Sequence, residues 1–365
     1  MKNKEKLIDL YTSFTIASFE NIEMTKLSKT LNGKISHDMF TKMLKENVNI
    51  EEELVKKGRK IINELEKVHG DGAIIIDDTL VKKPNSKENE LISYHYDNSE
   101  KRTIKGIGIV NFLYTPIGST SDMRVPISFE PIIKDIIYED PKNDFKEKRK
   151  SSINKNEIVR NKLTFLKENN IKFKYVLGDS WFASVENIEY IDNYLNKKFI
   201  FRIKDNRLIA LSEQDKINGN YIKIKDVDLS LKKDCLVYIK GSPTPFRLTK
   251  LYVKNGMNYV STSAYLLSNI YDMEIITLSE IYQKRWRIEE FHKSLKQNLK
   301  IERSPTKISS TQLNHIFLTF LAFIKLEKLR TKFNTNHYAL KEQLYLSALQ
   351  EAMKKLNTLE EIKVA

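Results

Sequence analysis

The spacing of apolar residues changes along the chain, and each change predicts a different kind of structure. Residues 1 to about 70 have helical spacing and almost no strand-like alternation, with helices expected at Met24–Leu31, His37–Leu44 and 50–68. Asn32-Gly33 predicts a turn between the first two helices, and Ser36 is a candidate N-cap. This region is compatible with a helix-turn-helix-like unit and equally with a plain helical bundle.

From Asp71 short apolar runs alternate with helical stretches. The charged segment 139–157 is expected to be a surface loop. The pattern predicts strands and helices at Ala73–Ile76, Gly106–Tyr114, Arg124–Ile133, Ile158–Asn169 (helix), Phe173–Leu177, 184–195 (helix) and Lys198–Ile203. This order matches an α/β fold with a ribonuclease-H-like core. Two of the strands are expected to stop at acids, one at Asp77-Asp78 and one at Gly178-Asp179.

The remainder of the chain divides into three parts. Residues 205–275 look β-rich, with strands at Cys235–Ile239, Phe246–Val253 and Tyr259–Tyr265. Thr277–Glu280 forms a capping-box pattern, which predicts one long helix running to about Leu299. The tail is helical. The predicted layout is therefore a helical domain (1–70), a core (71–204 and 276–300), a β-rich insertion (205–275) and a C-terminal helical region (301–365).

Composition narrows the choice of partner and compartment. Lys plus Arg is 62 against 48 for Asp plus Glu, a net charge of +14 that favours nucleic acid as a partner. A lysine-rich proteome would also account for part of this excess. The single cysteine, Cys235, excludes an internal disulfide and a cysteine-based zinc site. We read no signal peptide, and the apolar run Ile316–Ile324 is too short to span a bilayer, so we expect a soluble cytoplasmic protein without a membrane partner.

The predicted helix from Leu278 carries a stripe of polar side chains. Helical rotation places Tyr282, Arg285, Glu289 and Lys296 within a sector roughly 60° wide. Apolar residues of the same helix form an adjacent face. Glu290 points elsewhere, so Glu289 is the better candidate for a functional acid. Trp286 and His292 lie beside the stripe, and Trp286 is expected to pack in a core or an interface.

This stripe resembles a known signature. The segment YQKRWRIEEFHKSLK meets the spacing Tyr-x2-Arg-x3-Glu-x6-Lys, and in this it is similar to the DDE transposases of bacterial insertion sequences in the Y-R-E-K group, insertion-sequence family four. IIIDDT (74–79) and YVLGDSWFAS (175–184) resemble the two aspartate strands of that family. The family also places a β-rich insertion before its glutamate. The resemblance covers residues 70 to about 300, with weaker helical matches on either side.

The resemblance implies the catalytic and metal-binding residues Asp77, Asp179 and Glu289. Asp78 is an alternative to Asp77, because neighbouring side chains of a strand point to opposite faces and only one of the two can join the site. An Asp-x-Thr pattern favours Asp77, and an Asp-Thr pattern favours Asp78. Oxygen ligands suit Mg²⁺ or Mn²⁺, and we expect two ions, with Asp77 between them.

The implied reaction is cleavage at the ends of an insertion sequence followed by strand transfer into target DNA, which is cut-and-paste transposition. Tyr282, Arg285 and Lys296 are expected to contact the DNA backbone. The helical domain 1–70 is a candidate for binding the ends. The implied partners are transposon-end and target DNA and a second protomer in a homodimeric complex, with the protein associated with the nucleoid when it is bound to DNA.

Several alternatives stay open at this point. A ribonuclease-H-like nuclease that only hydrolyses would need the same acids, and an inactive or domesticated descendant could act as a DNA-binding regulator. Asn314–Arg330 is either a buried helix or a dimer contact. Cleavage through a hairpin would need an aromatic platform for a flipped base. The β-rich insertion offers aromatic side chains that are either platforms or core residues: Tyr238, Phe246, Tyr252, Tyr259 and Tyr265.

Overall fold

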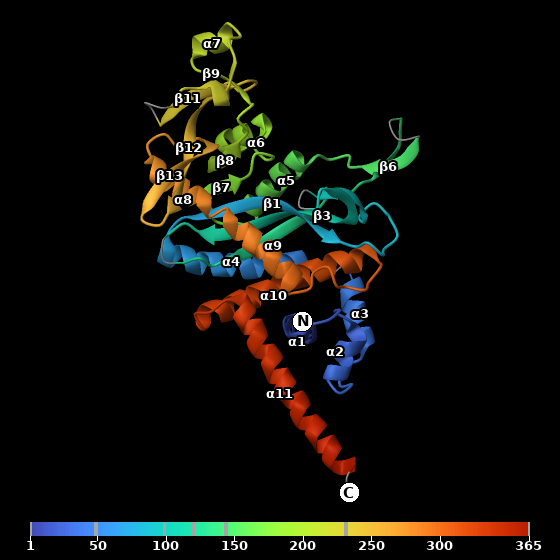
Figure 1. Ribbon diagram of the computed structural model, residues 1–365. Helices are drawn as coiled ribbons and strands as arrows, with labels where there is room; N and C mark the ends of the chain where they lie inside the picture. The colour runs from blue at the N-terminus through green and yellow to red at the C-terminus, as the bar shows by residue number, and fades with distance from the viewer. Residues whose placement is uncertain are drawn as a thin grey trace. The chain divides into compact units, whose positions relative to one another are not determined.

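The computed structural model describes residues 2–46, 50–97, 100–118, 121–141, 145–229 and 233–363. These residues form two compact units, one within Val55–Glu290 and one within Met1–Leu54 together with Phe291–Ala365. The first unit is mixed α/β and the second is helical (Figure 1).

A large mixed sheet, with eleven strands among the described residues, forms the first unit. Its order is β10-β9-β11-β12-β13-β8-β7-β1-β3-β2, and β4 also pairs with β3. The strands are β1 (Gly72–Lys82), β2 (Ser93–Asp97), β3 (Arg102–Pro116), β4 (Val125–Pro131), β7 (Tyr175–Gly178), β8 (Lys198–Ile203), β9 (Leu208–Ala210), β10 (Ile222–Lys223), β11 (Asp234–Ile239), β12 (Pro245–Asn255) and β13 (Asn258–Ser268).

The centre of the sheet is parallel and buried. β1 runs parallel to β7, and β7 runs parallel to β8, whereas β3 is antiparallel to β1. Parallel strands that are covered on both faces have continuous apolar sequences. Residues 73–76 of β1 are such a sequence, and all four are fully buried. Figure 1 shows α4 (Ile50–His69) on one side of these central strands. On the other side lie α5 (Lys155–Glu168) and α6 (Val185–Glu189), which continues into a π-helical turn at Tyr190–Tyr194.

Two predictions about this region are wrong. β1 does not stop at the acids but continues through Asp77 and Asp78 to Lys82, because β3 supplies hydrogen-bonding partners along that whole length. The stretch 139–157 is not a loop. It overlaps a two-stranded hairpin of β5 (Ile136–Asp140) and β6 (Lys146–Lys150), followed by α5 with Asn154 as its N-cap. The alternation of apolar and polar residues that predicts a strand is hard to recognise in this hairpin, because nearly every side chain is polar or exposed.

The strands of the predicted β-rich insertion join the main sheet beside β8. β13 pairs with β8 and with β12, so β8 is continued by the meander of β13, β12 and β11. Two short elements, α7 (Glu213–Ile217) and a 3-10 turn at Ile224–Asp226, lie between β9 and β11 in the chain. A β-bulge between Lys250 and Tyr252 frees backbone groups of β12, and Tyr252 uses them to bind Ser279 and Gln283.

The predicted long helix after the insertion is two helices. α8 spans Ile275–Gln283 and α9 spans Trp286–Gln297. At the break, Arg285 N–H donates to Tyr282 O and Ile288 N–H donates to Arg285 O, which is the tighter i to i−3 pattern of a 3-10 turn. The capping-box prediction is also wrong, because α8 begins before Thr277 and its N-cap, Glu274, makes no side-chain cap hydrogen bond.

The helical unit contains α1 (Lys2–Ala17), α2 (Met24–Thr30), α3 (His37–Lys45), α10 (Ser309–Lys332) and α11 (His337–Lys363). The predicted turn is confirmed, with positive φ at Asn32 and Gly33. Ser36 caps α3 by accepting from Asp38 N–H at 3.2 Å. Asn314 of α10 donates to Leu44 O at 2.8 Å, which ties α10 to the end of α3.

The apolar run Ile316–Ile324 lies inside α10 and is largely buried, as the burial reading of this segment predicted. Among the described residues, no helix is both long enough and apolar enough to cross a membrane.

Candidate active site

Asp77 and Asp78 lie side by side on β1 in different surroundings. Asp77 is mostly buried, with its side chain 15% exposed. Asp78 is 33% exposed, and its Oδ2 lies 2.7 Å from the ammonium of Lys155 at the start of α5. Because β1 continues through both residues, their side chains leave opposite faces of the strand. Lys155 is 77 positions from Asp78 along the chain, and no sequence pattern pointed to this pairing.

Asp179 follows directly after β7, next to β1 in the sheet. The parallel register pairs Ile75 with Leu177, which places Asp179 at the level of Asp77 on the neighbouring strand. Gly178 allows the close approach of β8, since a Cβ there would lie 2.9 Å from the Phe201 ring. The Asp179 carboxylate accepts a hydrogen bond from the backbone N–H of Trp181 at 2.9 Å, which holds it at the end of the strand.

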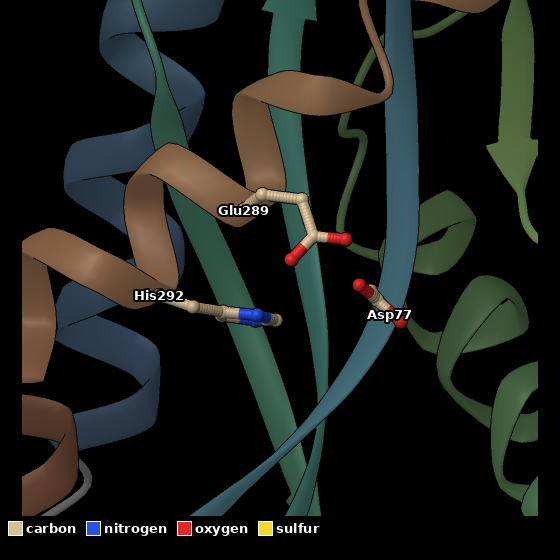
Figure 2. Close-up of side chains that lie close together, drawn as sticks. All are labelled: Asp77, Glu289 and His292. Carbon is tan, nitrogen blue, oxygen red and sulfur yellow. The ribbon is translucent and has the colours of Figure 1, made fainter. Parts of the chain in front are cut away.

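Glu289 comes to the same place from α9. Figure 2 shows its carboxylate directed from the helix toward Asp77 on β1, and ligand oxygens of the two residues lie within 4.8 Å of one another. The fully buried Ile288 anchors this turn of the helix. Glu290 has other partners, because its Oε2 lies 3.2 Å from Arg124 and 2.9 Å from Arg287. The structure therefore separates the two glutamates as the sequence predicted.

Burial and neighbouring charges raise the pKa values of two of these acids. Burial, followed by the charges of Glu289, Asp78 and Asp179, raises the pKa of Asp77 from 3.8 to about 8. Burial also raises the pKa of Asp179. Arg285 opposes both shifts. Its Nη1 lies 3.9 Å from Asp77 Oδ2 and 3.4 Å from Glu289 Oε1, and its side chain is only 13% exposed.

Tyr282 and Arg285 lie on either side of the break between the helices. Residues three apart are already neighbours on an α-helix, and in the 3-10 turn at the break they eclipse one another more closely. Tyr282 is buried, and its burial, together with the Asp179 charge, raises its pKa to about 12 against the opposing influence of Arg285. Arg285 thus contacts two of the acids directly, and Tyr282 lies beside Arg285. Lys296 is half-buried on α9, seven positions after Glu289.

Exposure distinguishes the aromatic side chains of the region. Trp286 is 62% exposed, so of its two predicted environments, a core or an interface, the core is excluded, and the Arg285 guanidinium lies 5.2 Å from its ring centroid. Phe246 and Tyr265 are buried core residues, whereas Tyr238, Tyr252 and Tyr259 are half-buried.

The donor set fits a hard divalent cation. Asp77 and Glu289 offer oxygens close enough to share one ion, and a cation would offset both the burial and the neighbouring negative charges that raise the pKa of Asp77. Asp179 lies near enough to contribute to that repulsion. His292 lies three residues after Glu289 on α9. This helix therefore carries two kinds of possible metal ligand, a carboxylate oxygen and an imidazole nitrogen (Figure 2).

Comparison with known proteins points to one class. Residues 150–324 match the family model described as "Transposase DDE domain", a range that includes Asp179 and Glu289 and begins after Asp77. A relative from Geobacillus stearothermophilus, named "Probable transposase for insertion sequence element IS5377", is 27% identical over 160 residues. The matched part covers 41% of this chain and 39% of the relative, so this chain matches about two fifths of that protein. The chain is thus similar to a DDE transposase domain over residues 150–324 and to a transposase of an insertion sequence over 160 residues, and together the two matches support a DDE transposase.

Proposed function

We propose that this protein is a transposase that cuts DNA at the ends of an insertion sequence and joins those ends to target DNA. The observation that carries the proposal is the proximity of Asp77 on β1 to Glu289 on α9, whose ligand oxygens lie within 4.8 Å of one another, with Asp179 at the level of Asp77 after the neighbouring strand β7 and close enough for its charge to act on Asp77. The match to a DDE transposase domain over residues 150–324 supports it.

The strand arrangement supports a ribonuclease-H-like core. β4, β3 and β1 form an antiparallel run, and β7 and β8 continue from β1 as parallel neighbours. Crossover α5 leads from the antiparallel run into β7, and α6 leads from β7 to β8. Ligands of open α/β sheets bind outside the carboxyl ends of parallel strands, and Asp179 lies at such an end.

In this proposal Asp77, Asp179 and Glu289 would hold Mg²⁺ or Mn²⁺, which we infer to be two ions. Bound divalent cations activate an attacking water or 3′-hydroxyl and stabilise charge on the leaving oxygen. Arg285 holds the Asp77 and Glu289 carboxylates side by side. Tyr282 is buried next to Arg285, and its hydroxyl stays protonated at neutral pH and so remains a hydrogen-bond donor there.

The partners follow from the same proposal. The Tyr282-Arg285-Glu289-Lys296 spacing supports membership of insertion-sequence family four, with the cations directed to the DNA backbone. We assign end recognition to the helical domain 1–70, chemistry to 71–204 and 276–300, and supporting roles to the insertion 205–275 and the C-terminal region 301–365. The active complex would be a homodimer on paired ends, located in the cytoplasm at the nucleoid.

The test is cleavage of a DNA fragment that carries the terminal sequence of the element encoding this chain, with Mg²⁺ or Mn²⁺ present. Glu289→Gln should abolish cutting while DNA binding persists. Glu290→Gln is the matched control, because the neighbouring glutamate pairs with Arg124 and Arg287 away from Asp77, and it should retain cutting.

Three results would contradict the proposal in different ways. Cutting that survives Glu289→Gln would mean that the active site lies elsewhere. End binding by the wild-type protein without any cutting would favour a DNA-binding regulator. Cutting without joining to target DNA would favour a nuclease that only hydrolyses.

A further inference from the structure

A cavity of about 240 Å³ opens beside Asp179, where the parallel strands β7 and β8 end. Its walls come from the loop after β7, which carries Trp181, and from the turn after β8, which runs from Lys204 to Arg207. Asn156 and Asn206 add amide groups, and Ile203 adds an apolar surface. The lining thus combines an aromatic ring, two cations and two amides.

The Trp181 indole is held in an exposed position. The side chain is 63% exposed, yet its backbone N–H donates to Asp179 Oδ1 at 2.9 Å, so the loop that presents it is fixed to the candidate active site. The Lys204 ammonium lies 4.8 Å from the centroid of the indole. A large aromatic side chain left in water at a cavity is a feature of binding surfaces.

The cations of the cavity are available to a ligand. Within the described ranges, neither Lys204 nor Arg207 forms an ion pair with a carboxylate, although Arg207 helps to lower the pKa of Glu186. The turn that carries both cations also contains one acid, the exposed Asp205. Two positive charges and one negative charge leave the turn with a positive net charge. Backbone hydrogen bonds from Ile224 to Arg207 O and from Lys225 to Asp205 O hold this turn in place.

We propose that this cavity binds one unstacked nucleotide of a DNA strand, with its base on the Trp181 indole and its phosphates beside Lys204 and Arg207. Every base has a π-face that can stack on an aromatic ring, and cations along a groove follow the phosphates. The amides of Asn156 and Asn206 can bind the edge of the base. The inference rests on the proposed function, since Asp179 would place the bound nucleotide next to the bond that is cut.

Fluorescence provides a direct test, because the chain has two tryptophans. In a Trp286→Phe background Trp181 is the single tryptophan, so tryptophan emission excited selectively over the tyrosines reports on Trp181 alone. We expect its emission to be quenched in a saturable way by single-stranded oligothymidylate at low salt in the presence of EDTA. A blunt duplex of the same length should quench less, because its bases are already stacked on one another.

Substitutions made in the chain with Trp286 intact then distinguish stacking of a base on Trp181 from nonspecific binding of DNA to the basic protein. Trp181→Leu should weaken oligothymidylate binding by about 5- to 150-fold, the range expected for loss of one base–aromatic stack. Trp181→Tyr should restore most of the affinity, and the pair Lys204→Ala and Arg207→Ala should weaken binding and reduce its salt dependence. Tyr96→Leu is the matched control, since it removes another exposed aromatic, 63% exposed, from β2.

Unquenched Trp181 emission, or equal affinity of Trp181→Leu and wild type in a folded protein, would overturn the inference. Thermal unfolding of each variant shows that it is folded. Because the binding test is done without metal, its outcome is independent of cutting. Quenching without any metal-dependent cleavage would remove the proposed function and keep the subsite, whereas cleavage without quenching would do the opposite.

Discussion

Asp77 and Asp78 are adjacent on β1, yet only Asp77 lies with Glu289 and Arg285, while Asp78 is bound by Lys155 at 2.7 Å. The difference arises because β1 continues through both residues and its side chains alternate between the two faces of the sheet. Two acids that the sequence could not tell apart therefore have separate surroundings in the structure.

Asp77→Asn should abolish metal-dependent cleavage, whereas Asp78→Asn should reduce it by about tenfold or less, because Asp78 acts on the site through its charge and not as a ligand. Cleavage of the element end under matched metal concentrations measures both. If Asp78→Asn were inactive and Asp77→Asn active, the assignment of the two acids would be reversed.

The raised pKa of Asp77 predicts a pH dependence of stability in the metal-free protein. The group has a pKa of about 8 when folded and about 3.8 when unfolded, so the folded state retains a proton that the unfolded chain releases. Stability from this group therefore falls as pH rises from about 4 to 8 and stays low above that. Asp77→Asn should remove this decrease, with a gain on the order of 1–3 kcal/mol at pH 8.5.

Unfolding by urea at pH 5 and at pH 8.5, in EDTA and in Mg²⁺, measures this effect as the difference between wild type and Asp77→Asn. Mg²⁺ should stabilise the wild type more at pH 8.5, because binding displaces the Asp77 proton. A wild-type to variant difference that does not change between the two pH values would argue against the raised pKa.

Arg285 is predicted to need its guanidinium as well as its charge. Its Nη1 lies between carboxylates of Asp77 and Glu289, and a lysine ammonium cannot present the same planar set of donors. Arg285→Lys should lower the cleavage rate by about tenfold or more while DNA affinity changes less. A cleavage rate unchanged by Arg285→Lys would show that charge alone is enough.

The homodimer prediction now has a specific candidate surface. Helix α10, which we considered as a dimer contact, is largely buried, whereas α11 exposes apolar residues at helical spacing. Leu346, Leu349, Met353 and Leu356 are 48%, 41%, 58% and 55% exposed. A seam with this spacing is typical of paired helices. Leu349→Glu with Met353→Glu should weaken self-association in the DNA complex at least about tenfold, with folding stability changed by no more than about 0.5 kcal/mol.

Light scattering coupled to gel filtration, with and without end DNA, measures the mass of that complex. Lys354→Ala is a control on the same helix, because Lys354 and its ion-pair partner Glu351 both have side chains that are 74% exposed. A dimer that persists in the double variant would place the contact elsewhere.

The sequence by itself determined the features that depend on local spacing. Apolar runs located the buried strands at 73–76 and 198–203, the Asn32-Gly33 pair located a turn, and Ser36 located a cap. Helical rotation also placed Glu289 and Glu290 on different sides of their helix, and in the structure the two side chains have different neighbours. These features could be predicted because their physical causes lie within a few residues of each other.

Only the tertiary structure decided what depends on distant partners. It extended β1 past its acids, broke the predicted helix between Gln283 and Trp286, and brought Lys155 to Asp78 across 77 positions. It also left Trp286 62% exposed, whereas the sequence was compatible with a core or an interface position. Strand length depends on the neighbouring strand and helix breaks depend on the surface beneath them, so these outcomes are set by packing that no local window of sequence contains.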